Sequence, residues 1–166
     1  MKTIKIEWYV TRILDDLNAI TRHAEKRTAC KRKGVGCRLI NLYSSGMASQ
    51  VMAFNGPSAK KFECTNEVGN CGCMHSEPKA IIEGLKKGFK KKEFIMLFTY
   101  SPCTNCANII ISSGIVKGII YTILTEHDKR GDALLRGSID VVTTAELKSR
   151  KANAIIKRWI SLDPKH

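Results

Sequence analysis

The segment "EFIMLFTYSPCTNCANIIISSGIVKGIIYTIL" (residues 93–124) contains the pattern that decides the fold. Residues 93–100 are dominated by an apolar run, which is typical of a buried strand. Residues 103–114 predict a helix, and residues 116–124 predict a second strand. Strands that alternate with helices predict an α/β sheet covered by helices on both faces.

The rest of the chain continues this alternation. Apolar residues at helical spacing, such as Ile13, Leu17 and Ile20, predict an amphipathic first helix at residues 7–27. Thr144 is the predicted N-cap of the last helix. The other predicted elements are strands at 35–43, 49–56 and 139–143, helices at 77–88, 131–137 and 144–160, and an irregular cysteine-rich stretch at 57–74. No repeat or linker interrupts the sequence, so we expect a single domain over residues 1–166.

The composition is that of a globular protein, with 43% hydrophobic and 26% charged residues. No apolar run approaches the roughly 20 residues that a membrane span requires, so no membrane partner is expected. The N-terminal stretch lacks the apolar core and the cleavage site of a signal peptide. We therefore expect a cytoplasmic protein with reduced thiols, whose seven cysteines are metal ligands rather than disulfide partners.

The formal net charge is +13, and cations are concentrated at residues 22–33 and 86–92. A basic surface attracts phosphate groups, so a nucleotide or a nucleic acid is a candidate partner. The second run also lies at a predicted helix end, where the helix dipole favours cations. Because charge runs are usually solvated faces, that run does not by itself predict a phosphate site.

Two cysteines open the predicted helix at 103–114. Cys103 and Cys106 have the C-x-x-C spacing, and residues three apart lie on one face of a helix, so both sulfurs can reach one ion. The partial positive charge at a helix start favours the thiolates that bind metal. Redox dithiols use the same spacing, so this motif alone leaves both interpretations open.

A histidine and a carboxylate lie at the start of the preceding helix, in "HSE" (75–77). His75 with the two cysteines would make three protein ligands, and a catalytic zinc site leaves its fourth position to water. Glu77 could then contact that water without binding the metal. An ordinary helix start with an acidic residue in its first turn also gives the pattern His-x-Glu. The hypothesis of a catalytic zinc site therefore depends on both motifs together.

Together these residues resemble the signature H-x-E followed by P-C-x-x-C of the zinc-dependent cytidine-deaminase-like enzymes. Within that superfamily, the chain is most similar to deoxycytidylate (dCMP) deaminases of the phage and bacterial type, over about residues 10–143. "RTACKRKGVG" (27–36) resembles the element R-S-x-C-x-R-x-x-V-G, and "AFNGP" (53–57) resembles G-Y-N-G-x-P. "TYSPCTNCANIIISSGIVKGIIY" (99–121) resembles T-L-S-P-C-x-x-C-A-x-x-I-x-x-x-G-I-x-x-V-x-Y.

This resemblance implies a three-layer α/β/α sandwich around a mixed five-stranded sheet, assembled as a homohexamer. The implied activity is zinc-dependent hydrolysis of dCMP to dUMP and ammonia, which supplies the precursor of thymidylate. His75, Cys103 and Cys106 would bind the catalytic zinc. Glu77 would carry protons between water, N3 of cytosine and the leaving amine.

Substrate contacts are also implied by the resemblance. Asn55 matches a family residue that holds the sugar and the base, and Thr99 and Ser101 flank the site entrance. Arg27 lies near the position where the family binds phosphate, with Lys31 as an equal candidate.

Two motifs depart from the family pattern. The usual H-A-E-x-N-A is "HSEPKA" (75–80) here, so a substrate contact from Lys79 is not implied. The turn G-Y-N-G, which the family links to nucleotide regulation, is "AFNG" (53–56). Allosteric control by dCTP and dTTP is therefore not implied either.

Four further cysteines lie near the first motif: Cys30, Cys64, Cys71 and Cys73. Four is the number that a closed structural zinc site needs. They match the positions of a second zinc in some phage dCMP deaminases, so the resemblance implies that "CGCMHSE" (71–77) joins a structural site to a catalytic one. The alternative is four reduced thiols in a loop, since C-x-C is less usual in zinc sites than a wider spacing. Cys37 lies in a predicted strand and is expected in the core.

Two other functions stay open at this point. A deaminase of a cytosine in RNA or single-stranded DNA is favoured by the charge of +13, although no base-stacking aromatic run or separate RNA-binding domain is visible in the sequence. A non-catalytic zinc-binding regulatory protein is disfavoured by the intact Glu77. Within the enzyme hypothesis, dCTP or a 5-substituted dCMP could replace dCMP as the substrate.

Overall fold

The computed structural model of the protein describes residues 6–41, 50–59, 61–68, 70–89, 94–125 and 128–161. A five-stranded sheet in the order β2-β1-β3-β4-β5 lies at its centre. The strands are β1 (Gly36–Asn41), β2 (Gln50–Phe54), β3 (Phe94–Tyr100), β4 (Val116–Ile123) and β5 (Asp140–Thr143). β1 is antiparallel to β2 and β3, whereas β3, β4 and β5 run parallel, which confirms the predicted mixed sheet.

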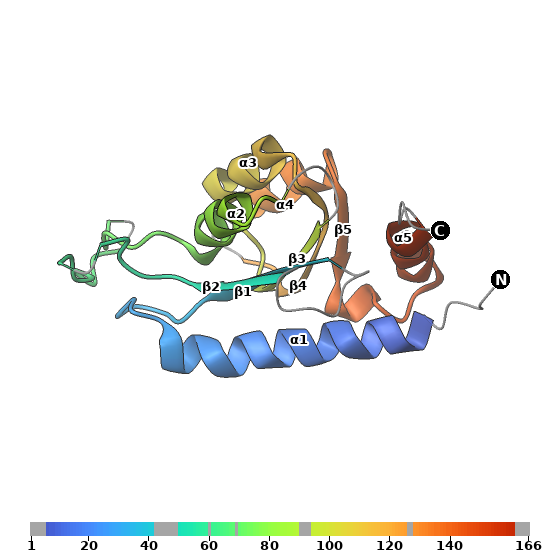
Figure 1. The fold of residues 1–166 in the computed structure, drawn as a ribbon, viewed down its shortest axis with the longest axis horizontal. Helices are drawn as coiled ribbons and strands as arrows, with labels where there is room; N and C mark the ends of the chain where they lie inside the picture. The colour runs from blue at the N-terminus through green and yellow to red at the C-terminus, as the bar shows by residue number, and fades with distance from the viewer. Residues whose placement is uncertain are drawn as a thin grey trace.

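Helices cover both faces of this sheet (Figure 1). α1 (Ile6–Arg27) and α5 (Arg150–Ser161) share one hydrophobic core with one face of the sheet. α2 (Ser76–Lys86), α3 (Thr104–Ser113) and α4 (Lys129–Arg136) cover the other face. The three-layer α/β/α arrangement is therefore also confirmed.

The central strand β3 contributes to both cores. Ile95 and Leu97 belong to the core beside α1 and α5, whereas Met96 and Phe98 belong to the core beside α2, α3 and α4. All four side chains are 1% exposed or less. Because successive residues of a strand point to opposite faces, a strand covered on both sides needs an uninterrupted apolar run.

The edge of the sheet at the carboxyl end of β3 is where α2 and α3 begin. β3 ends at Tyr100 and α3 starts four residues later at Thr104, while α2 starts at Ser76 and packs against α3. The first turns of both helices therefore meet at this edge, and they carry the residues that the sequence motifs single out.

The end of the chain differs from the prediction of one helix at 144–160 capped by Thr144. The Glu146 carboxylate accepts hydrogen bonds from the backbone N–H (2.7 Å) and the hydroxyl (2.9 Å) of Thr143, which closes a short 3-10 turn, η2 (Thr144–Glu146). α5 then starts anew at Arg150, and the hydroxyl oxygen of Ser149 accepts the N–H of Ala152 at 3.0 Å. Two local caps thus divide the predicted helix. Thr143 caps the 3-10 turn and Ser149 caps the start of α5, so the prediction of Thr144 as the N-cap was wrong.

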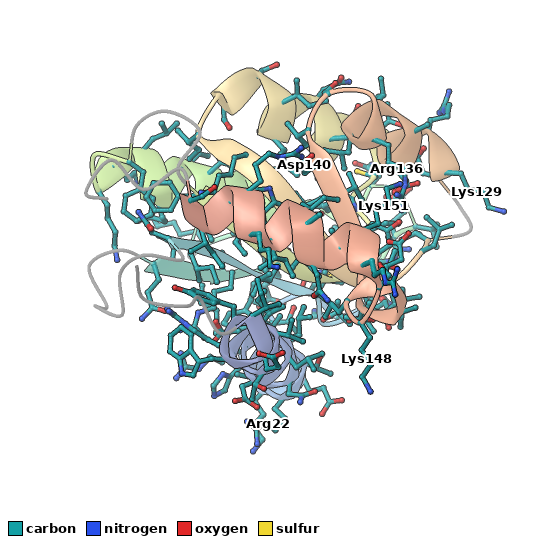
Figure 2. The ribbon with its side chains drawn as sticks, turned by 90° about the vertical axis from the view of Figure 1, so that its right-hand side faces the viewer. Arg22, Lys129, Arg136, Asp140, Lys148 and Lys151 are labelled. Atoms are coloured by element: carbon teal, nitrogen blue, oxygen red, sulfur yellow. The ribbon has the colours of Figure 1, made fainter. Side chains whose placement is uncertain are left out.

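Cationic side chains are spread over several elements. Arg22 on α1, Lys129 on α4, Lys151 on α5 and Lys148 just before it are all exposed (Figure 2). None of the helices in the described part of the chain combines the length and the apolar character that crossing a membrane requires.

Candidate active site and metal centres

His75 precedes the first turn of α2, where the chain leaves the cysteine-rich loop. Its backbone is extended (φ −66°, ψ 159°) and it occupies the N-cap position of the helix. The residue before it, Met74, exchanges two backbone hydrogen bonds with Gly56, of 3.0 and 3.1 Å. The loop after β2 therefore fixes the direction in which the chain enters α2.

The two cysteines of α3 face this histidine. Nδ1 of His75 lies 3.7 Å from Sγ of Cys103 and 3.4 Å from Sγ of Cys106. The three ligand atoms all lie within 4.8 Å of one another. Around one tetrahedral zinc, with Zn–S near 2.3 Å and Zn–N near 2.0–2.1 Å, an imidazole nitrogen and a thiolate sulfur are about 3.6 Å apart. The donor set and its spacing therefore fit a single zinc ion.

The electrostatics of this group favour a metal-binding thiolate. Hydrogen bonds from Cys106 and His75 lower the pKa of Cys103 to about 4. The same hydrogen bond to Cys103, together with burial and the charge of Glu77, raises the pKa of Cys106. One sulfur is thus ionised at neutral pH, and a cation between the two would favour ionisation of the other as well.

Glu77 lies in the first turn of α2 and is only 5% exposed. Its Oε2 accepts a hydrogen bond from the hydroxyl of Ser76 at 3.0 Å. Burial raises the pKa of Glu77. Cys37 in β1 supports the same turn, because its buried thiol donates to the carbonyl of Ser76 at 3.1 Å. A buried carboxyl with a raised pKa is suited to taking up and returning protons.

A second group of metal-ligand type is formed by Cys30, Cys64, Cys71 and Cys73. Their four sulfurs lie within 4.8 Å of one another, and Cys30 and Cys64 are 3.9 Å apart. Two sulfurs of a tetrahedral zinc–thiolate site are about 3.8 Å apart, so this group also fits zinc. Gly72, in the left-handed region at φ +70°, makes the tight turn between Cys71 and Cys73 that the unusual C-x-C spacing requires.

Backbone donors surround the second group. Although burial acts in the opposite direction, hydrogen bonds from the backbone N–H groups of Lys31 and Asn66 contribute to lowering the pKa of Cys64 to about 6. Asn66 adopts a left-handed conformation (φ +67°). Such N–H donors to a sulfur stabilise the thiolate form, which is the form that binds metal.

Asn55, a predicted substrate contact, is 8% exposed and organises the loop before β1. Its Oδ1 accepts the hydroxyl of Thr28 at 2.6 Å and the N–H of Val35 at 2.9 Å. Its Nδ2 donates to the carbonyl of Lys33 at 2.8 Å and carries a second hydrogen that a substrate could use.

The other predicted substrate contacts lie in different surroundings. The hydroxyl of Thr99 lies 3.5 Å from that of Thr21 on α1, which is on the face of the sheet opposite α2 and α3. Ser101 is buried, and its hydroxyl oxygen accepts the N–H of Thr125 at 2.8 Å. Arg27 is exposed at the end of α1.

Sequence reasoning missed three contacts around this edge. Nζ of Lys33 lies 3.5 Å from the ring centre of Tyr100, at the end of β3. The carboxylate of Asp128 holds Thr104, and Gly131 packs against the turn before α3. Asp128 lies 24 residues from Thr104 in the sequence, so no local motif could have indicated this contact.

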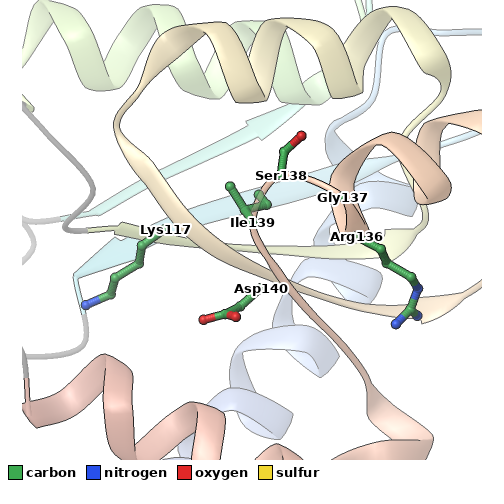
Figure 3. A pocket seen from close by; sticks show the side chains of 6 residues that line it. All are labelled: Lys117, Arg136, Gly137, Ser138, Ile139 and Asp140. Atoms are coloured by element: carbon green, nitrogen blue, oxygen red, sulfur yellow. The ribbon is translucent and has the colours of Figure 1, made fainter.

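A surface hollow of about 360 Å³ lies away from these groups. It is lined by Lys117, Arg136, Gly137, Ser138, Ile139 and Asp140 (Figure 3). Lys117 and Asp140 stand at the starts of β4 and β5, and these strands run parallel to β3. The hollow is therefore at the edge of the sheet opposite the candidate metal ligands.

Comparisons with known proteins agree with this geometry. No curated protein matches the chain. The structure resembles dCMP deaminase from the cyanophage S-TIM5 in its apo form, at a TM-score of 0.56 and 26% identity over 76% of this chain and 94% of the phage chain. The same enzyme in complex with dCMP and dUMP gives a TM-score of 0.60 and 22% identity over 86% of this chain and 98% of the phage chain. A Thermotoga maritima diaminohydroxyphosphoribosylaminopyrimidine deaminase/reductase gives a TM-score of 0.55 and 16% identity. The match covers 93% of this chain and 39% of the Thermotoga chain.

The family model for the cytidine and deoxycytidylate deaminase zinc-binding region matches residues 17–122. This range spans more than half of the chain and contains both metal-ligand groups and Glu77. The chain therefore belongs to the cytidine and deoxycytidylate deaminase family.

Proposed function

We propose that the protein is a zinc-dependent hydrolase that converts dCMP to dUMP and ammonia. The observation that carries this proposal is the approach of His75 Nδ1 to the sulfurs of Cys103 and Cys106, at 3.7 and 3.4 Å, beside the buried Glu77. Family membership supports deamination, and 26% identity to a phage dCMP deaminase supports the choice of nucleotide.

In the proposed reaction, His75, Cys103 and Cys106 hold the metal. Zinc, when bound by such a ligand set, supplies a Lewis acid that activates water at neutral pH. Glu77 takes a proton from the attacking water and gives it to N3 of cytosine as the water oxygen adds to C4. The same carboxyl then passes a second proton from that oxygen to the amino group, which leaves as ammonia. The hydroxyl of Ser76 holds one carboxyl oxygen during these transfers.

We further propose that Cys30, Cys64, Cys71 and Cys73 bind a second, structural zinc. Four thiolates leave no open position for water, so this ion would take no part in the chemistry. The support is the approach of four sulfurs to within 4.8 Å of one another.

The roles of the metal ligands and of Glu77 can be tested together. Glu77→Gln should lower turnover of dCMP by at least about 10³-fold, because it removes the proton carrier, while zinc bound per chain stays at the wild-type value. Cys106→Ser is the matched variant and should lose zinc as well as activity. Ammonia release and metal analysis measure the two quantities. Near-normal turnover in Glu77→Gln with zinc retained would refute the mechanism.

A second candidate, deamination of a cytosine in RNA or single-stranded DNA, is favoured by the net charge of +13. A substrate panel separates the two. We expect ammonia from dCMP and little from CMP, deoxycytidine, dCTP, RNA or single-stranded DNA. Release from a polynucleotide with none from dCMP would replace the first candidate by the second.

A further inference from the structure

The turn that carries Cys103 is capped by a residue from outside its own helix. Cys103 occupies the N-cap position of α3, but its side chain makes no capping hydrogen bond there. Instead, the backbone N–H of Thr104 donates to Oδ2 of Asp128 at 2.7 Å, and the hydroxyl of Thr104 donates to Oδ1 at 2.7 Å. A carboxylate 24 residues further along the chain therefore satisfies the first N–H of α3 with one oxygen and accepts the Thr104 hydroxyl with the other.

The residues before Thr104 are held by the same stretch of chain. The N–H of Ser101 donates to the carbonyl of Ile123 at 2.8 Å. Thr125 bonds Ser101 twice, through its N–H at 2.8 Å and its hydroxyl at 3.0 Å. Residues 101–104 thus make five hydrogen bonds to the last residue of β4 and the segment that follows it.

The first turn of α4 closes this arrangement by direct packing. A Cβ atom at Gly131 would lie 2.2 Å from the carbonyl oxygen of Pro102 and 2.7 Å from the carbonyl carbon of Cys103. Both neighbours are backbone atoms, which cannot move without shifting Cys103 itself. The absence of a side chain at Gly131 is therefore what allows α4 to rest against the turn.

We propose that Asp128 is a positioning residue for the metal centre, which fixes the first turn of α3 so that Cys103 and Cys106 converge on the ion held with His75. This inference rests on the zinc site of the proposed function. Without Asp128 the first turn of α3 loses its cap, and the Cys103 sulfur can leave the position at which the three ligand atoms meet. The carboxylate acts through the backbone and does not bind the metal or the substrate.

The test measures zinc affinity rather than activity alone. The zinc ion that is present in the wild type but lost in Cys106→Ser is the ion of this site. Competition with a chelator measures the affinity of each variant for that ion. Asp128→Ala should weaken that affinity about tenfold, the lower end of what is typical for residues that orient metal ligands. Asp128→Asn should restore most of it, because its amide oxygen can still accept the Thr104 N–H. Glu146→Ala removes a comparable cap elsewhere and should leave the affinity unchanged.

Three further outcomes keep the proposal open to refutation. Excess zinc in the assay should restore the activity of Asp128→Ala, which a residue that contacts the substrate would not allow. Gly131→Ala should also weaken this zinc site by displacing Cys103. If Asp128→Ala does not fold, Thr104→Val removes only one of the two bonds and should weaken zinc by a smaller factor.

Wild-type zinc affinity in Asp128→Ala, or in Thr104→Val if Asp128→Ala does not fold, would overturn the inference while leaving the proposed activity intact. Weakened zinc binding in a protein that does not deaminate dCMP would support the inference and remove the proposed substrate.

Discussion

The buried amide of Asn55 bonds three groups of residues 28–35, and this makes it the strongest single-residue prediction for stability. Asn55→Ala leaves the N–H of Val35 and the carbonyl of Lys33 without partners. Each hydrogen bond contributes about 0.5–1.5 kcal/mol, so with three bonds lost we expect the free energy of unfolding to fall by about 2–3 kcal/mol in urea denaturation. Asn18→Ala, at an exposed position on α1, is the control and should change it by less than about 0.5 kcal/mol. A loss that small in Asn55→Ala would contradict the structural role.

The same comparison shows what the sequence could predict at the level of residues. The ligand-type residues His75, Cys103 and Cys106 lie in contiguous motifs, and their meeting at one point was predictable from helix spacing and from the family signature. The contacts that hold them were not predictable. Asp128 reaches Thr104 across 24 residues, and which residues meet over such a distance is set by the packing of the whole sheet.

Among the elements, the closing turn after β5 provides a test of pH dependence. The N–H of Thr143 holds the pKa of Glu146 below its ordinary value of 4.5. A carboxyl whose pKa is lower in the folded chain stabilises the fold above the unfolded-state pKa, and this stabilisation is lost as the pH falls through the folded-state pKa. Glu146→Gln should therefore be about 1 kcal/mol less stable than the wild type at pH 7, and the difference should shrink below about pH 4. Urea denaturation across pH 3–7 measures it, and a difference independent of pH would contradict the assignment.

The predicted elements were recovered wherever periodicity and caps agree. β3 was predicted from its apolar run, and the structure shows why that run is needed, since both faces of the strand are covered. The last helix was misjudged because its apolar spacing continues through the 3-10 turn, whereas the capping bonds of Thr143 and Ser149 divide it. At the start of the last helix, local hydrogen bonds therefore determine the helix boundary, although the apolar periodicity extends beyond it.

At the scale of the whole molecule, the stretch from Cys71 to Glu77 belongs to both metal-ligand groups. Cys71 and Cys73 face the four-sulfur group, and His75, two residues later, faces the sulfurs of α3. Met74 between them is bonded to Gly56, so the two directions are fixed by the loop after β2. Loss of the four-sulfur group should therefore lower the free energy of unfolding and also disturb the backbone where the chain enters α2.

The four-sulfur group also joins segments that are distant along the chain. Cys30 follows α1, Cys64 lies in the loop after β2, and Cys71 and Cys73 precede α2. A zinc ion there would cross-link these segments, and because it binds the folded arrangement of the four sulfurs, its binding would stabilise the fold.

We expect Cys64→Ser to lose one zinc per chain and to lower the free energy of unfolding by about 3 kcal/mol, the size typical of a disulfide cross-link. Cys37→Ala is the control, because Cys37 is buried outside both groups and its loss should reduce stability without changing the zinc content. Metal analysis and urea denaturation of the two variants measure these effects. If Cys64→Ser keeps the wild-type zinc content while Cys106→Ser loses an ion, the four cysteines are reduced thiols, and the fold at this loop is held without a metal ion.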